Sequence, residues 1–438
     1  MFRLWGKEFK DNRMLRDTVI CDDSDETRTH KIFNALEEIC YEFDLSKPIW
    51  LDVTIAEFKK HAKARFYQDN FVDSIDFDYL EIQVIEEEHM NKNTFSNRVT
   101  WYNFILCIFV VWIHAQNTDL FTEVVMTEGK PLFNQIEQTI VSDIAVVGVA
   151  GFFLCSGYLF YRNYSWGKVL EKYKTRFVGL LIPYVIWTLL YYFIHVGVSY
   201  ITPLRAVFNE PPITVTWKGI VDAVLNYRYC AFLWFLQFLI LLVVLSPLIY
   251  LLISNKYMGI VAIVLVLVID STGICGDLAF GSVQAQAFCN WLFIYMTGGY
   301  IGIHGSGAVE SKNTSWLLLL ASVILAVLAH YFFKHSPSMF TNLIYLLLFA
   351  AALWCVVCKL PLPMAANWQK HTFIVYMTHF LIVRGMNVLV SKYLSASMWP
   401  GILLFFLLPV LCFALTSLFW RICGKGQSFV WKMLSGNR

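Results

Sequence analysis

From residue 98 onward, the chain consists of long apolar stretches separated by short polar ones. Most of these stretches reach the roughly 17–25 residues that an α-helix needs to cross a bilayer. The fifth is short, and a re-entrant segment is the alternative for it. The pattern predicts an all-α polytopic membrane protein with about ten transmembrane helices, at residues 99–117, 140–162, 177–201, 231–253, 258–272, 287–304, 315–333, 342–358, 372–391 and 400–420.

Residues 1–97 have a different pattern, typical of a small soluble α+β domain. Apolar residues at helical spacing over residues 32–43 predict one amphipathic helix. Thr54-Ile-Ala-Glu57 has the form of a capping box and predicts a second helix through about Arg65. Alternating apolar residues predict strands at residues 49–53 and 79–85. We expect this domain to fold by itself and to be joined to the rest of the chain by a linker over residues 91–97.

The role of residues 1–97 stays open at this level. The segment has no glycine-rich phosphate loop, no paired metal ligands and no basic patch. Two alternatives remain: a regulatory module that binds a cytosolic partner, or an independent domain joined by fusion.

Composition and charge support the division into two parts. The chain is 58% hydrophobic and 15% charged, well outside the range of soluble domains. The net charge is −7 up to residue 98 and +9 from residue 99 onward. An acidic soluble domain therefore precedes a basic, apolar body, and a soluble enzyme is excluded.

The distribution of Lys and Arg predicts the topology. The start of the chain has no apolar region typical of a secretory signal, so we expect residues 1–97 in the cytosol. With ten crossings, 15 Lys and Arg residues fall on the inner side and 6 on the outer side. The sequence thus predicts a multi-pass protein of the cell membrane with a membrane domain at residues 98–422. Both termini would be cytosolic, with residues 423–438 forming a basic tail.

His114 is the first candidate for chemistry. It lies near the end of the first predicted span, where an ionisable side chain is costly and therefore a candidate functional group. Asp143 lies near the same end of the second span, and a carboxylate beside a histidine can orient it as a general base. The alternative is that His114 sits at headgroup level, bonded to water or to Asp119.

The second candidate is the basic segment between the second and third spans. Five cations crowd into fifteen residues, namely Arg162, Lys168, Lys172, Lys174 and Arg176. They can hold anionic lipid and fix the topology. They can also bind a phosphate-rich cytosolic ligand, since Arg and Lys are the usual partners of phosphate.

Three further residues or pairs have competing interpretations. Cys355 and Cys358 have Cys-x-x-Cys spacing but lack a second pair, so we interpret them as helix packing. Ser156 beside Gly157 resembles a nucleophile only superficially, and serine beside glycine is common at tight helix contacts. His379 in the ninth span either lines the same cavity as His114 or belongs to a polar cluster with Tyr376 and Thr378.

Several motifs, in order, resemble those of acyltransferase family 3. The first span ends in Phe109-Val-Val-Trp-Ile-His114, and Gly151-Phe-Phe-Leu-Cys-Ser-Gly-Tyr-Leu-Phe160 follows in the second. Arg176 stands seven residues before Pro183-Tyr-Val-Ile-Trp187. Later matching stretches are Leu233-Trp-Phe-Leu236, Tyr295-Met-Thr-Gly-Gly-Tyr300 and Phe373-Ile-Val-Tyr-Met-Thr-His379. The resemblance covers residues 98–422.

The resemblance implies a membrane O-acyltransferase that takes an acyl group, mostly acetyl, from cytosolic acyl-CoA. The acceptor would be a hydroxyl of a surface carbohydrate or envelope molecule. His114 would be the catalytic base, with Asp143 as our proposed orienter, and Arg176 would contact the CoA phosphates. Two positions depart from the family pattern, because Gly179 and Asn103 stand where the family usually has arginines. Lys172, Lys174 or Arg162 would then supply the missing charge, and no metal is implied.

Two other function classes remain alternatives. One is a non-catalytic membrane sensor that keeps the fold but has lost CoA binding. The other is a polysaccharide transport component, which we would expect to show charged pairs near the middle of the membrane and internal repeats. Arg384 and Asp270 are the only deeply placed charges, and the sequence shows no repeat.

Overall fold

The structure is a computed structural model, and the chain divides into two compact units, Met1–Lys92 and Asn93–Arg438. It describes residues 2–11, 13–22, 26, 28–85, 95–121, 129–202, 205, 211–274, 276, 279–280, 283–311, 315–394, 397–423 and 429–436. Most of the expected linker lies outside these residues.

The first unit is an antiparallel sheet with two helices. Its strands are β1 (Phe2–Lys10), β2 (Arg13–Asp22), β3 (Lys63–Phe66) and β4 (Tyr79–Val84), in the order β2-β1-β4-β3. The helices are α1 (Arg28–Glu42) and α2 (Asp52–His61). Helix α1 approaches the sheet closely because Gly6 has no side chain: a Cβ there would lie 2.5 Å from Ile39. The core is formed by fully buried residues of both layers, including Leu4, Leu36, Ile39, Phe66 and Leu80.

The sequence predicted part of this unit correctly. Helix α1 and strand β4 are confirmed. The predicted strand at residues 49–53 is wrong, because helix α2 already begins at Asp52. The predicted capping box is also wrong: Leu51 is the N-cap, and the buried Thr54 accepts a hydrogen bond from Asn70 Nδ2 (3.3 Å). Helix α2 ends before Arg65, because Ala62 takes a left-handed conformation (φ 52°).

A buried charge cluster joins three strands of the sheet. Glu81 on β4 is only 3% exposed and accepts from Lys7 (3.3 Å), Lys63 (2.7 Å) and Arg65 (2.9 Å). Burial by itself raises the pKa of Glu81. The hydrogen bonds from Lys63, Arg65 and Lys7 outweigh burial, so the pKa of Glu81 lies below its ordinary value of 4.5.

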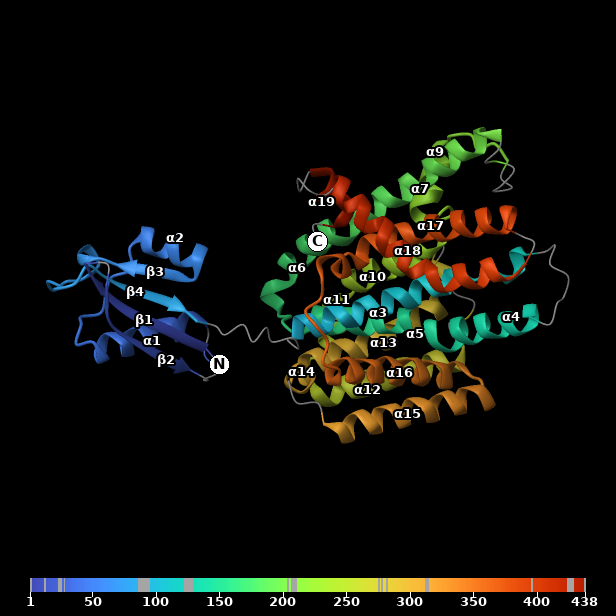
Figure 1. Cartoon of the computed structure of the whole chain (residues 1–438). Helices are drawn as coiled ribbons and strands as arrows, with labels where there is room; N and C mark the ends of the chain where they lie inside the picture. The colour runs from blue at the N-terminus through green and yellow to red at the C-terminus, as the bar shows by residue number, and fades with distance from the viewer. Residues whose placement is uncertain are drawn as a thin grey trace. The chain divides into compact units, whose positions relative to one another are not determined.

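The second unit is a bundle of long helices (Figure 1). Its first helices are α3 (Phe95–Ala115), α4 (Gly129–Thr139), α5 (Val147–Tyr161), α6 (Val169–Arg176), α7 (Ile182–Tyr200) and α9 (Trp217–Asn226). The middle of the unit contains α10 (Trp234–Val244), α11 (Ser246–Ile253), α12 (Lys256–Thr272), α13 (Ala285–His304) and α14 (Ser306–Glu310). The last are α15 (Trp316–His335), α16 (Met339–Lys359), α17 (Thr372–Tyr393), α18 (Trp399–Cys423) and α19 (Phe429–Ser435). Helices α6, α14 and α19 lie at the end of the bundle where α3 begins (Figure 1).

The expected ten spans are not confirmed. By length and composition, the described residues contain seven helices able to cross a membrane, or up to nine if each of two bent pairs is one span. Helix α9 meets α10 at 53°, and α11 folds back on α12 at 118°. The predicted span at residues 231–253 is interrupted at a different point, Leu245, which lies between α10 and α11. Pro247 lies in the first turn of α11, where its missing N–H ends the continuity of α10.

Helices α4 and α5 form one long helix through a π-helical segment, η3 (Ile140–Ala145). Helices α6 and α7 are joined in the same way by η5 (Phe177–Leu181). A π-turn places one extra residue in the helix and changes the direction of the side chains on either side of it. Both predicted spans begin later than these continuous helices do.

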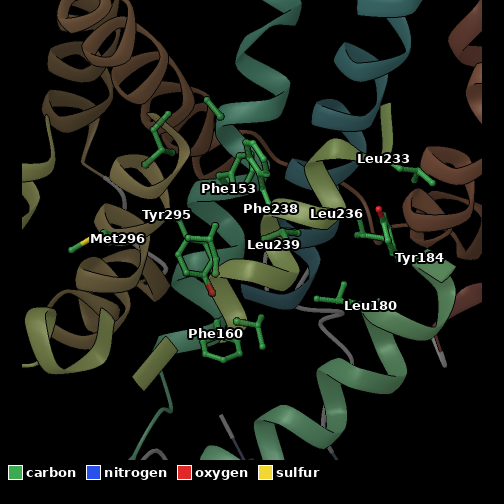
Figure 2. Packing of buried hydrophobic residues seen from close by; sticks show 14 of the residues in the cluster. Phe153, Phe160, Leu180, Tyr184, Leu233, Leu236, Phe238, Leu239, Tyr295 and Met296 are labelled. Carbon is green, nitrogen blue, oxygen red and sulfur yellow. The ribbon is translucent and has the colours of Figure 1, made fainter. Parts of the chain in front are cut away.

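Close packing of α5 on α13 forms the centre of the bundle. A Cβ at Gly157 would collide with the carbonyl oxygen of Tyr295, and one at Gly298 with that of Leu154. Only glycine allows the two backbones to come this near. Figure 2 shows buried residues around this contact, with Phe153 and Phe160 on α5 and Tyr295 and Met296 on α13.

The first unit gives a prediction for pH-dependent stability, measured on a fragment of residues 1–92, which has its own core. A depressed carboxyl pKa stabilises the fold above the unfolded-state value and stops doing so as the pH falls through the folded-state value. We expect the free energy of unfolding of the fragment to decrease as the pH is lowered through about 4.5. The substitution Glu81→Gln should make this pH dependence weaker. At neutral pH, Glu81→Gln should lower the free energy of unfolding by about 1–3 kcal/mol in urea titrations, because the buried Lys7 loses its charged partner.

The control for this experiment is Glu37→Gln. Glu37 pairs with Lys47 at the surface, where both side chains are more than half exposed, so its loss should change stability little. Equal pH profiles for the wild-type fragment and Glu81→Gln would contradict the role given to the cluster.

Candidate active site

A cavity of about 350 Å³ lies inside the second unit. Most of its wall is aromatic or aliphatic, and Figure 2 shows part of it, with Phe160, Leu180, Leu236, Leu239 and Tyr295. The wall also carries a small set of polar side chains, namely Asn103, His114, Ser156, Arg176, Tyr295, Thr372 and Tyr376. Such a cavity, mostly apolar with a few convergent polar groups, is typical of a site for a small ligand.

His114 occupies the last turn of α3 and faces this cavity. The end of α3 is held by side chains of two other helices. Glu137 of α4, which is 1% exposed, accepts from the backbone N–H groups of Asn117 (3.0 Å) and Thr118 (3.2 Å). Asn387 of α17 donates to the carbonyl of Ala115 (3.3 Å). The carbonyl of Ala115 is one of those that the C-terminal end of a helix leaves unpaired. The N–H groups of Asn117 and Thr118 belong to the start of the short turn η2 (Thr118–Leu120). Together these bonds hold the chain directly after His114.

A second histidine lies against His114. The ring of His379 on α17 is fully buried, and its centroid lies 5.1 Å from that of His114. His379 Nδ1 is 2.6 Å from the carbonyl oxygen of Tyr376. Phe232 and Phe380 enclose the pair, with ring centroids 5.0 Å from His379 and 5.6 Å from His114 respectively. The two histidines thus share an apolar surrounding.

Arg176 reaches the same cavity from the other side. It ends α6, directly before the π-helical η5, and its guanidinium lies over the ring of Phe160 (5.6 Å). Within the part of the chain that the structure describes, no ion pair joins Arg176 to an acid. His114 and Arg176, which the sequence connected only through motifs, therefore line one cavity.

The other predicted cations do not line the cavity. Lys172 donates to the carbonyl of Phe160 (3.0 Å), and Lys174 is exposed on α6. Arg162 pairs with Glu310 of α14 (2.9 Å) and covers the ring of Phe95. Their place as ligands of a cofactor stays a prediction.

Asp143 is engaged elsewhere. It lies in η3, where its carboxylate forms an ion pair with Lys334 Nζ (2.6 Å) and lies 4.0 Å from His330 Nε2. Its polar contacts among the described residues are with α15, whereas the ring contacts of His114 are with α17. Its role beside His114 stays a prediction.

The two departures from the family pattern have physical correlates. Asn103 lines the cavity, and its side-chain oxygen is buried without a hydrogen-bond partner in the described structure. Gly179 is buried under the end of helix α19, where a Cβ would lie 3.5 Å from the carbonyl oxygen of Gly436. Trp187 Nε1 also donates to the carbonyl of Leu434 (3.0 Å), which fixes α19 on α7. The residue that follows α19 thus lies in van der Waals contact with the place where a side chain at position 179 would begin.

Other sequence interpretations have partial answers. Gly157 packs against α13 as expected, while Ser156 beside it lines the cavity. Cys358 Sγ accepts from Arg98 of α3 (3.4 Å), which agrees with a packing role. Within the described residues, no group of three or more His, Cys, Asp or Glu side chains is arranged to hold a metal ion.

The helices and the cavity among them place the protein in the class of multi-pass membrane proteins. A family model described as an acyltransferase domain matches residues 99–421, nearly the whole second unit. The chain therefore belongs to acyltransferase family 3, as its motifs predicted. Comparisons with the curated proteins and with the solved structures give no match.

The anchored end of α3 gives a second prediction. Glu137→Ala leaves the N–H groups of Asn117 and Thr118 unpaired in a buried place, each at a cost of about 1–3 kcal/mol. We expect a lower thermal midpoint of the full-length protein in detergent, and a smaller loss for Glu137→Gln, which keeps one acceptor. The exposed neighbour Gln138→Ala is the control and should behave as wild type. An unchanged midpoint in Glu137→Ala would contradict the anchoring role.

Proposed function

We propose that the protein is an O-acyltransferase of the cell membrane that uses a cytosolic acyl-CoA, with acetyl as the acyl group. The acceptor is a hydroxyl of a surface carbohydrate or envelope molecule. One observation carries the proposal: a single cavity is lined by both His114 and Arg176. Histidine can act as a general base, and arginine can bind phosphate.

His114 has the position of the base. In the reaction, the acceptor oxygen attacks the thioester carbonyl, and its proton passes to His114. The C–S bond then breaks, an ester remains on the acceptor, and the CoA thiolate takes up a proton. A positioned base of this kind contributes about 10²–10⁴-fold to the rate. The apolar wall around the site excludes water, which would otherwise compete with the acceptor for the acyl group.

Arg176 has the position of an anchor for the donor. A cavity of about 350 Å³ holds an acyl group and part of a pantetheine arm, whereas the nucleotide of CoA has to stay outside. Arg176 would contact the phosphates where the arm enters, with Lys172, Lys174 and Arg162 as neighbouring charges on the same segment. We place this segment and both chain ends on the cytosolic side, following the distribution of Lys and Arg.

Transfer of label from acetyl-CoA tests the proposal directly. Membranes that contain the full-length protein should move the labelled acetyl group to an envelope fraction. His114→Ala should lower the rate at least about 100-fold with the protein still present, because the base is lost. His335→Ala is the matched control, since this histidine is exposed at the end of α15 and is bonded to the carbonyl of Tyr331 in its own helix (2.8 Å). Full activity in His114→Ala would exclude His114 as the base. No transfer by the wild type over a panel of acceptors would favour the sensor or transport alternatives.

A separate measurement tests the donor site. Arg176→Gln should raise the KM for acetyl-CoA about tenfold or more and leave kcat nearly unchanged, since a charge-assisted contact to phosphate is lost. Arg421→Gln removes an exposed charge at the end of α18 and should leave the KM as in wild type. Equal KM values for all three proteins would exclude Arg176 from the donor site.

A further inference from the structure

His114 needs a partner on the ring nitrogen that does not take the proton of the acceptor. Without such a partner, neutral His114 exchanges between its two tautomers. The nitrogen that faces the cavity is then basic in only one of them. The sequence suggested a carboxylate for this role. The contacts of Asp143 with Lys334 leave His114 with a different neighbour, His379.

The hydrogen bond between His379 and Tyr376 determines which ring nitrogen of His379 carries the hydrogen. A carbonyl oxygen only accepts, so Nδ1 must carry the hydrogen that it shares with the carbonyl of Tyr376 (2.6 Å). In the neutral ring, Nε2 is then an acceptor. This atom is fully buried, and it has no hydrogen-bond partner among the described residues. A buried acceptor without a donor is costly, so one is expected to approach it in the working enzyme.

The surroundings of His379 leave few donors. Phe232 and Phe380 are apolar, and the hydroxyl of Tyr376 already donates to the carbonyl of Phe232 (2.6 Å). Among the described residues whose rings contact His379, the other polar one is His114. His114 lines the cavity and His379 does not, so His379 stands behind His114 as seen from the cavity.

We propose that His379 is the positioning residue of His114: its Nε2 accepts a hydrogen bond from the ring N–H of His114 and thereby turns the basic nitrogen of His114 toward the acceptor hydroxyl. This inference rests on the proposed function for its effect on the rate. Its structural part, the tautomer of His114, holds with or without a substrate. A neutral acceptor also suits the apolar surrounding, where an unpaired carboxylate would be far more costly to bury.

Three variants of the full-length protein test the kinetic part. His379→Phe keeps an aromatic ring and removes the acceptor, and His379→Asn has a side chain too short to reach His114. His379→Gln carries an oxygen near the place of Nε2 and should restore the acceptor. We expect kcat to fall about 10- to 100-fold in the Phe and Asn variants, with KM values close to wild type, and to recover in the Gln variant. If Gln is as impaired as Phe, or if KM changes as much as kcat, His379 has only a packing role.

Nitrogen-15 NMR of labelled histidines in the lipid-reconstituted protein tests the structural part without any substrate. The signals of His114 are assigned by their loss in His114→Ala. We expect one neutral tautomer of His114 in the wild type and in His379→Gln, and a mixture of tautomers in His379→Phe. Identical His114 signals in all proteins would overturn the proposal. If the wild type transfers no acyl group, the proposed function fails while the NMR comparison still decides the role of His379.

Discussion

The site depends on one constraint: a helix that ends inside an apolar bundle must have its last backbone groups paired without help from water. The amide of Asn387 meets this need for the carbonyl of Ala115 at the end of α3, and the carboxylate of Glu137 pairs the N–H groups of Asn117 and Thr118 directly after it. Because Asn387 belongs to α17, the same bonds also hold α17 against α3. The neighbourhood of the two histidines, and the end of the cavity that His114 faces, both follow from this connection.

The apolar pattern predicted the long helices well, because a helix is the only open-ended structure that satisfies its own backbone in a membrane. The predicted span at residues 372–391 is α17 almost residue for residue. The pattern could not show the interruption of residues 231–253 at Leu245, since a continuous apolar run reads the same whether the helix is continuous or broken, and Pro247 was the available signal. In the first unit, the hairpin of β1 and β2 was missed because Gly6 and Glu8 take buried positions where apolar residues were expected.

The sequence predicted two residues of the candidate site, His114 and Arg176, but not the cavity between them or the residue that packs against His114. Motif order located His114 and Arg176, and both line the cavity. The neighbour of His114 was sought nearby in the sequence, whereas the structure places a residue of α17 against it. A signal was present: Asn387 follows His379 by about two turns, so both lie on one face of α17, and a polar pair on one face of a membrane helix is rarely there for packing.

The π-helical segment η5 joins α6 to α7 and determines the direction in which Arg176 points relative to α7. Each residue advances an α-helix by about 100°, so a π-turn changes the phase of everything before it relative to everything after it. Trp187 and Tyr191 anchor the later part in the core, which leaves Arg176 on the earlier, shifted part. Were this stretch wound as a regular α-helix, the same arginine would face another side of the bundle, so the phase of the backbone selects which surface receives the charge.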